Sequence, residues 1–257
     1  MKIFPTVGIS RFRIGVLALI WAILVFDLCE IEVNYLAPRS VRPSDTNLIN
    51  NPTSYGEALV RLGEQERMPC DVIFIGASNV AHWKDTGLEV WNQYYSSRHA
   101  FNFGVDGDTT ENVLWRLDHT NLSMLKPKVA VIFVGLNNLG DSSREIALGV
   151  KAVSNKARSL FPGVKVLLIG LTPNVRNNEV VLQADKTIQT YADNKTVFYV
   201  DLYSKMPRKG SSWKGVGPDG VHFDKDGYAI WAEQMEPMLK QVLAADSVAM
   251  TIPSLPR

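Results

Sequence analysis

The chain has 257 residues, a formal net charge of +1, 46% hydrophobic residues and 21% charged residues. This balance is typical of a globular protein and excludes a chain that charge repulsion keeps disordered. Basic residues form no long run. The electrostatic footprint of a nucleic-acid-binding protein is therefore missing, and we expect no nucleic-acid partner. The length suffices for one substantial domain with a large core.

Residues 1–35 carry a targeting signal. Lys2, Arg11 and Arg13 precede the apolar run Ile14–Phe26. Positive charge before such a run predicts a cytoplasmic N-terminus and an exported remainder. No convincing small-residue cleavage site follows, which favours an uncleaved transmembrane signal anchor over a cleaved signal peptide. We therefore expect a membrane-anchored domain outside the cytoplasm, periplasmic or extracellular, which would be secreted if the signal were cleaved.

The remaining chain divides by composition. Residues 36–69 are expected to form a linker and a short helix, because three prolines are mixed there with small polar residues. Residues 70–247 alternate apolar runs with helical patterns, and residues 248–257 form a C-terminal tail. We therefore predict one folded domain that follows an anchor and a linker.

The alternation within residues 70–247 predicts an α/β fold. Strands that are apolar throughout indicate a parallel sheet that is covered on both faces. Right-handed crossovers with one reversal of winding predict the strand order 2-1-3-4-5. The expected strands are Val72–Ile75, Ala100–Phe103, Val129–Val134, Lys165–Ile169 and Val197–Asp201, and the expected helices are Gly56–Arg67, Thr110–Leu117, Ser143–Leu160, Glu179–Ala192 and a last one over residues 225–245.

Ser78 follows the first of these strands, and its hydroxyl has two interpretations. It is either the N-cap of a helix or a nucleophile. In the predicted strand order, the loops after the first three strands meet at one edge of the sheet. These loops carry Ser78, the segment Gly104–Asp108 and the segment Gly135–Asn138. The nucleophile interpretation requires a base and an oxyanion hole to converge on Ser78.

Asp219 and His222 provide a candidate base. At a spacing of three residues on a turn, the carboxylate can hold one imidazole nitrogen while the other faces Ser78, as in a Ser-His-Asp triad. Alternatively, Asp219 ends a loop and His222 caps the last helix. Candidate donors to an oxyanion are the backbone amides of Ser78 and Gly107 and the side-chain amide of Asn137.

Four short blocks occur in a fixed order along the chain: Gly76–Ser78, Gly107, Gly135–Asn138, and the pair Asp219 and His222. This order resembles the SGNH, or GDSL-type, serine hydrolase family. The segments Asn102–Leu117, Lys126–Val129 and Val134–Asn138 look most like the catalytic subunits of its platelet-activating-factor acetylhydrolase branch. The resemblance implies a flavodoxin-like three-layer α/β/α sandwich with a five-stranded parallel sheet. It also implies ester hydrolysis without metal or cofactor, often with a preference for short acyl groups.

The resemblance assigns a role to each candidate residue. Ser78 becomes the nucleophile, His222 the general base and acid, and Asp219 the group that orients His222. The backbone amides of Ser78 and Gly107, together with the side chain of Asn137, become the oxyanion hole.

Two positions depart from the family pattern. Ala77 stands where the usual G-D-S motif has an aspartate, and Asp106 stands where the relatives have a glycine. Either change, if uncompensated, can impair the enzyme. His82, four residues after Ser78, is expected to lie one helical turn further on and to point away from the direction of attack.

We therefore expect a serine esterase that removes a short acyl group, foremost acetyl. Its substrate would be a small ester, an acylated polysaccharide or a lipid. The same acyl-enzyme could pass its acyl group to a sugar hydroxyl, which makes an O-acetyltransferase the alternative. A catalytically silent, anchored binding protein of the same fold is the second alternative, and the sequence leaves the oligomeric state open.

Overall fold

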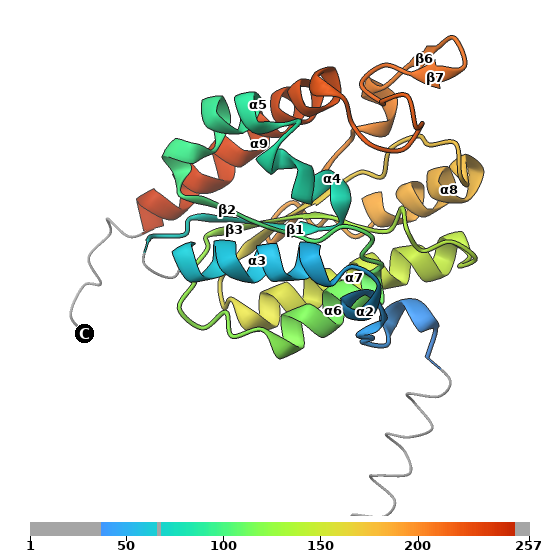
Figure 1. Cartoon of the computed structure of the whole chain (residues 1–257). Coiled ribbons are helices and arrows are strands. Elements are labelled where there is room, and N and C mark those ends of the chain that lie inside the picture. Colours follow the sequence, from blue (N-terminus) through green and yellow to red (C-terminus); the bar gives the residue numbers. More distant parts are fainter. Residues whose placement is uncertain (1–36, 66–67, 250–257) are drawn as a thin grey trace, which may run out of the picture. The chain divides into compact units, whose positions relative to one another are not determined.

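The computed structural model describes residues 37–65 and 68–249 (Figure 1). The predicted signal anchor lies outside these residues, as does most of the predicted C-terminal tail. Within the described part, no helix combines the length and the apolar character that crossing a membrane requires. The anchor therefore stays a prediction.

A five-stranded parallel sheet forms the centre of the fold. Its strand order is β2-β1-β3-β4-β5, as predicted, and every neighbouring pair is parallel. All five residues of β1 and of β3 are buried, which explains why these strands are apolar throughout. The strands are β1 (Val72–Gly76), β2 (Ala100–Gly104), β3 (Val129–Phe133), β4 (Lys165–Ile169) and β5 (Val197–Val200).

Helices cover both faces of the sheet, which gives the three layers visible in Figure 1. α3 (Pro52–Gln65), α6 (Thr110–His119) and α7 (Ser143–Leu160) lie on one face, and α8 (Asn178–Gln189) packs against α7. α5 (Leu88–Tyr94) and α9 (Lys225–Ala249) lie on the other face. The predicted parallel α/β architecture is therefore confirmed.

Capping side chains explain where two of these helices begin. Ser142 and Glu145 form a capping box at the start of α7, and Thr109 and Asn112 form one at the start of α6. Both helices then turn an apolar side to the core. The sequence already contained these signals, so α7 has the predicted bounds.

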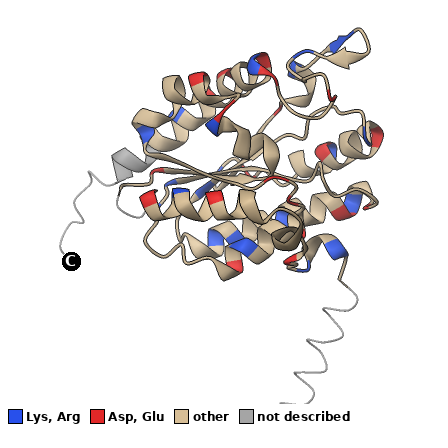
Figure 2. Ribbon diagram, in the orientation of Figure 1, with Lys and Arg blue, Asp and Glu red and all other residues tan. Residues whose placement is uncertain are grey.

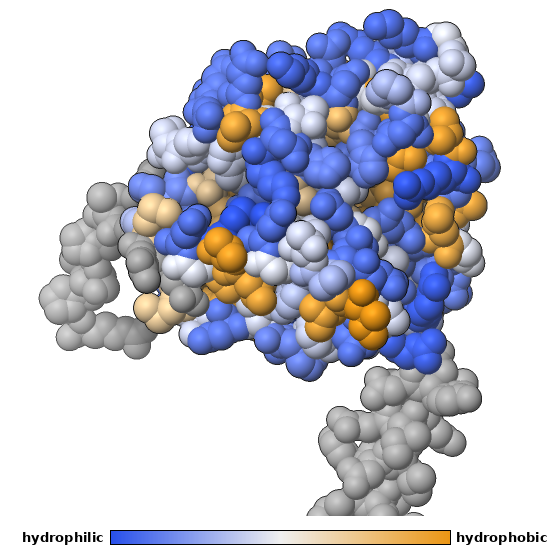
Figure 3. Space-filling model, viewed as in Figure 1, coloured by the Kyte–Doolittle hydropathy of each residue, from blue (hydrophilic) through white to orange (hydrophobic). Residues whose placement is uncertain are grey.

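The surface is mixed in charge. Basic and acidic residues are interspersed along the helices in Figure 2. The face in Figure 3 is mainly hydrophilic with several apolar patches, and the exposed apolar side chains of the described residues include Leu59 and Val60 on α3.

The segment predicted as a linker packs on the domain. Contacts join η1 (Arg39–Val41) to α6 and α7, and α3 to β2, while α2 (Thr46–Asn50) precedes α3. A single compact unit begins at Arg39. The sequence predicted neither η1 nor α2.

The remaining elements are short. They are α4 (Ser78–Ala81), η2 (His82–Lys84), η3 (Ser96–Arg98), η4 (Tyr203–Lys205), β6 (Arg208–Lys209) and β7 (Ser212–Trp213).

Candidate active site

Ser78 is the first residue of α4, directly after β1. The helix packs closely on β2, because a side chain at Gly104 would overlap the backbone of Val80 and Ala81. Ser78 is buried, with 8% of its surface exposed. The short strand-to-helix connection therefore fixes the serine hydroxyl at the carboxyl edge of the sheet, where ligands bind in open α/β folds.

Ser78, His222 and Asp219 form one hydrogen-bonded chain. The Oγ atom of Ser78 lies 2.8 Å from Nε2 of His222, and Nδ1 of His222 lies 2.5 Å from Oδ2 of Asp219. The other carboxylate oxygen of Asp219 accepts hydrogen bonds of 2.9 Å from the amides of Val221 and His222. The structure thus brings together three residues that the sequence separates by up to 144 positions.

The electrostatics of this chain keep Asp219 ionised. Burial alone would raise the pKa of Asp219, but the hydrogen bonds from the His222 imidazole and from two backbone amides outweigh it and lower the pKa to about 2. A carboxylate that stays charged at neutral pH can orient the imidazole and stabilise its protonated form.

The loops after β2 and β3 carry the two remaining candidates. Gly107 has a φ of +77°, a conformation that glycine adopts without strain, and its amide donates no hydrogen bond to another described residue. The side-chain nitrogen of Asn137 donates to the Asp108 carbonyl at 3.1 Å. Its oxygen accepts from Nη1 of Arg176 at 3.0 Å. Asn137 thus keeps one N–H free for a ligand.

A small cavity lies beside Ser78. Its free volume is about 10 Å³, room for about one water-sized group. Ser78 and Asn137 both line it, so the candidate nucleophile and one candidate oxyanion donor face the same space. The other lining residues are Ala77, Asn79, Phe133, Val134, Gly135, Leu136 and Val221.

His82 does not point away from this site, and that prediction is wrong. Its ring centroid lies 5.2 Å from that of His222, and its Nε2 forms an ion pair of 3.2 Å with Asp106. Positions four apart on a helix share a face, so the spacing from Ser78 was the signal that could have predicted this. The contact with Asp106 outweighs burial and raises the pKa of His82, and the same contact lowers the pKa of Asp106.

The two departures from the family pattern have different surroundings. Asp106 is not among the described residues with positive φ. In this loop Gly107 has that conformation. Its side chain is paired with His82, so the extra carboxylate has a partner. Ala77 lines the small cavity and is the N-cap residue of α4, and nothing in the described part of the chain replaces the carboxylate that the motif usually has there.

Sequence reasoning missed a second asparagine, Asn79. Its side chain is buried and accepts a hydrogen bond of 3.0 Å from the amide of Phe223, and it donates one of 3.4 Å to the carbonyl of Val221. These two residues flank His222. No pattern in the sequence indicates this contact, because it joins segments more than 140 residues apart.

Comparison with known proteins places the chain in a family. Residues 74–230 match the model of the GDSL-like Lipase/Acylhydrolase family. The platelet-activating factor acetylhydrolase IB subunit alpha2 of Rattus norvegicus is 41% identical over 103 residues, which are 40% of this chain and 44% of that protein. This match thus spans less than half of that relative.

Two further comparisons cover more of the chain. The alpha1 subunit of the same enzyme from Rattus norvegicus is 38% identical over 199 residues, which are 68% of this chain and 78% of that protein. The solved structure of a GDSL-like lipase from Bacteroides thetaiotaomicron is 17% identical, with a TM-score of 0.59 over 73% of this chain and 98% of its own. This last likeness is one of fold. The chain belongs to the GDSL-like lipase/acylhydrolase family.

Proposed function

We propose that the protein is a serine esterase that hydrolyses short acyl esters, foremost acetyl esters, with Ser78 as nucleophile. The observation that carries the proposal is the unbroken chain of hydrogen bonds from Ser78 through His222 to Asp219. This is the arrangement that activates a serine hydroxyl, which is a weak nucleophile by itself.

The reaction has two halves. In the first, Ser78 Oγ attacks the ester carbonyl carbon while Nε2 of His222 takes the hydroxyl proton. The carbonyl oxygen becomes an oxyanion that the amides of Ser78 and Gly107 and the side chain of Asn137 stabilise. The tetrahedral intermediate then collapses, the bond to the alcohol breaks, and His222 gives its proton to the departing alcohol oxygen.

Water completes the cycle in the second half. His222 takes a proton from a water molecule, whose oxygen attacks the acyl-enzyme carbonyl. Collapse of this second intermediate breaks the bond to Ser78 Oγ, which recovers its proton from His222. Asp219 stays ionised throughout, which its lowered pKa supports.

The size of the cavity supports a short acyl group. Its free volume of about 10 Å³ admits a group of roughly the size of a methyl. Phe133, Leu136 and Val221 are among its lining residues. The names of the relatives, acetylhydrolases, agree with this preference.

We further propose that the esterase acts outside the cytoplasm while anchored to the membrane. The proposal rests on the apolar run Ile14–Phe26 and the basic residues before it. A reporter enzyme fused after Arg257 should be active only outside the cytoplasm, and the full chain should stay with membranes after a carbonate wash. Reporter activity in the cytoplasm would contradict the proposal, and a shortened, soluble product would indicate a cleaved signal.

The catalytic proposal is tested with a fluorophosphonate probe and with p-nitrophenyl esters of increasing chain length. The probe should label Ser78 in the wild type and not in Ser78→Ala, and the acetyl ester should have a higher kcat/KM than the octanoyl ester. Labelling of a different serine would refute the assignment. Transfer to an added sugar in preference to water would indicate an O-acetyltransferase, and a folded protein with neither labelling nor hydrolysis would indicate a silent binding protein.

A further inference from the structure

We propose that Asn47 is a positioning residue of the oxyanion hole, supplied by a segment outside the family domain. The inference rests on the proposed function, because it concerns the amide of Gly107. Asn47 belongs to α2, whereas the match to the family begins at residue 74. The starting observation is that this buried side chain makes all its polar contacts at the loop that carries Gly107, or at the neighbouring Asn51.

The amide of Asn47 brackets Gly107. Its nitrogen donates to the carbonyl of Asp106 at 2.8 Å and to Oδ1 of Asp108 at 2.6 Å, so both of its N–H groups are used. Its oxygen accepts from the side chain of Asn51 at 2.6 Å. With every donor engaged, the side chain is fixed in one orientation.

The contact with the Asp106 carbonyl sets the direction of the Gly107 amide. The carbonyl of Asp106 and the N–H of Gly107 belong to the same planar trans peptide unit, so they point in opposite directions. Asn47 holds the carbonyl on its own side, and the N–H is therefore directed away from α2. A β-carbon added to Gly107 would lie 2.6 Å from the side-chain nitrogen of Asn51, so this packing leaves no room for the loop to shift towards α2.

The second contact extends to the other oxyanion donor. The carboxylate of Asp108 is held between Asn47 and Nε of Arg116, at 2.6 and 2.7 Å. The carbonyl of Asp108 in turn accepts from the side chain of Asn137. Asn47 therefore also holds Asp108, which follows Gly107 in the chain and contacts Asn137.

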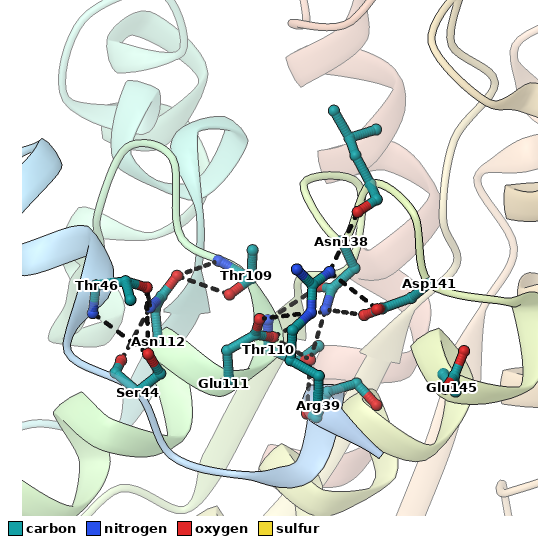
Figure 4. A network of polar contacts seen from close by, with 12 residues as sticks. Arg39, Ser44, Thr46, Thr109, Thr110, Glu111, Asn112, Asn138, Asp141 and Glu145 are labelled. Carbon is teal, nitrogen blue, oxygen red and sulfur yellow. Dashed lines mark hydrogen bonds and ion pairs between the residues drawn. The ribbon is translucent and has the colours of Figure 1, made fainter.

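The neighbouring part of the same segment holds the loop after β3. Arg39 donates to the carbonyl of Leu139 and pairs with Asp141, and Asn138 donates to Asp141 and to Glu111 on α6 (Figure 4). Both loops that carry oxyanion donors are thus fastened to residues 39–54. Asn47 is the member of this segment that contacts the peptide unit of Gly107.

The test compares Asn47→Ala with Gln65→Ala in the full chain. Gln65 is also a buried amide of the N-terminal segment and donates to a backbone carbonyl, but it lies at the far end of α3, about 16 Å of helix beyond Ser54. We expect kcat for p-nitrophenyl acetate to fall about 10- to 100-fold in Asn47→Ala, less than the loss of a whole donor, with KM unchanged within threefold. Gln65→Ala should lower the melting temperature similarly and change kcat less than threefold.

A second variant, Asn47→Asp, keeps the volume of the side chain but removes its N–H donors. At pH 8 the introduced carboxylate faces the Asp106 carbonyl and the Asp108 carboxylate, so kcat should fall at least as far as in Asn47→Ala. Protonation restores one donor, and kcat relative to wild type should therefore rise as the pH falls from 8 to 5.5. A purely structural role would not produce this pH dependence.

Two results would overturn the inference. One is equal kcat in Asn47→Ala and Gln65→Ala, and the other is a kcat of Asn47→Asp relative to wild type that does not change with pH. If the wild type hydrolyses no ester, the proposed function fails, and amide hydrogen exchange then decides the positioning role. Exchange in the peptide that spans residues 105–108 should be at least fivefold faster in Asn47→Ala than in Gln65→Ala. Equal exchange would also reject the inference.

Discussion

Replacement of Asn79 by alanine should show whether this side chain positions the general base His222, in addition to stabilising the fold. The side chain of Asn79 holds the amide of Phe223 and the carbonyl of Val221, on either side of His222. All three residues are buried, at 3–4% exposure, so water cannot take over these contacts without a rearrangement. The variant therefore loses the two hydrogen bonds that hold the residues on either side of His222. It also leaves two buried polar groups without partners.

The magnitude follows from these contacts. Each unpaired buried polar group costs about 1–3 kcal/mol, so the two together cost about 2–6 kcal/mol, which corresponds to a decrease in melting temperature of about 4–24 °C for a domain of this size. A displacement of a catalytic group by about 1 Å can cost about 100-fold in rate. We therefore expect the rate of fluorophosphonate labelling at Ser78, and kcat for p-nitrophenyl acetate, to fall about 10- to 100-fold.

The control is Asn102→Ala. Asn102 is also buried and also makes two hydrogen bonds, to the carbonyl of Ala81 and the amide of Gly104, but it does not contact the segment that carries His222. Its replacement should lower the melting temperature similarly and change the rate less than threefold. Equal rates in Asn79→Ala and Asn102→Ala would refute the reasoning.

Three further variants probe the site. Asp219→Asn should slow labelling of Ser78 by about 10²- to 10⁴-fold, since it disturbs the tautomer of the imidazole but leaves the base in place. Arg176→Ala should lower kcat about three- to tenfold, because Asn137 loses the group that orients it. Asn137→Ala should lower kcat about 10²- to 10³-fold. A larger decrease in Arg176→Ala than in Asn137→Ala would exclude Arg176 as the orienting group. Asp106→Asn should lower the free energy of unfolding most between about pH 4 and 6.5 and progressively less as the pH rises further, by at most about 1 kcal/mol, because the ion pair with His82 is partly exposed.

The pH window of the last prediction follows from the signs of the two shifts. The pKa of His82 is raised, so its contribution is complete below its ordinary pKa and disappears as the pH rises through the raised value. The pKa of Asp106 is lowered, so its contribution is complete above its ordinary pKa and disappears as the pH falls through the lowered value. Thermal melts of wild type and Asp106→Asn across pH 4–9 measure this window, and a constant difference would contradict it.

The central sheet could be predicted because its signal is local. Each strand is a short, wholly apolar run, and the capping residues Ser142 and Glu145 mark the start of α7 in the sequence itself. The strand order followed from general rules of connection, and that order alone brings the loops with Ser78, Gly107 and Asn137 to one edge of the sheet.

The contacts that hold the site in place could not be predicted. α2 is five residues long in a segment rich in asparagine and proline, whose local propensity is typical of a linker. The side chain of its Asn47 donates to partners 59 and 61 residues away, on the loop around Gly107. The same applies to Asn79, whose partners follow it by more than 140 residues. Long-range hydrogen bonds of single polar side chains leave no periodic trace in a sequence.

The two departures from the family motif carry unequal weight against activity. Asp106 forms an ion pair with His82, so its charge has a partner within the site. The positive φ of the loop occurs at Gly107 and not at Asp106, so the aspartate causes no backbone strain. Ala77 has no such compensation, yet the hydrogen bonds from Ser78 to His222 and from His222 to Asp219 do not pass through position 77. Ala77→Asp should therefore change kcat only slightly. The change should be smaller than the decrease in the rate of Ser78 labelling that Asp219→Asn causes. An increase of more than 100-fold on restoring the aspartate would instead mean that the natural residue holds the enzyme in a nearly silent state.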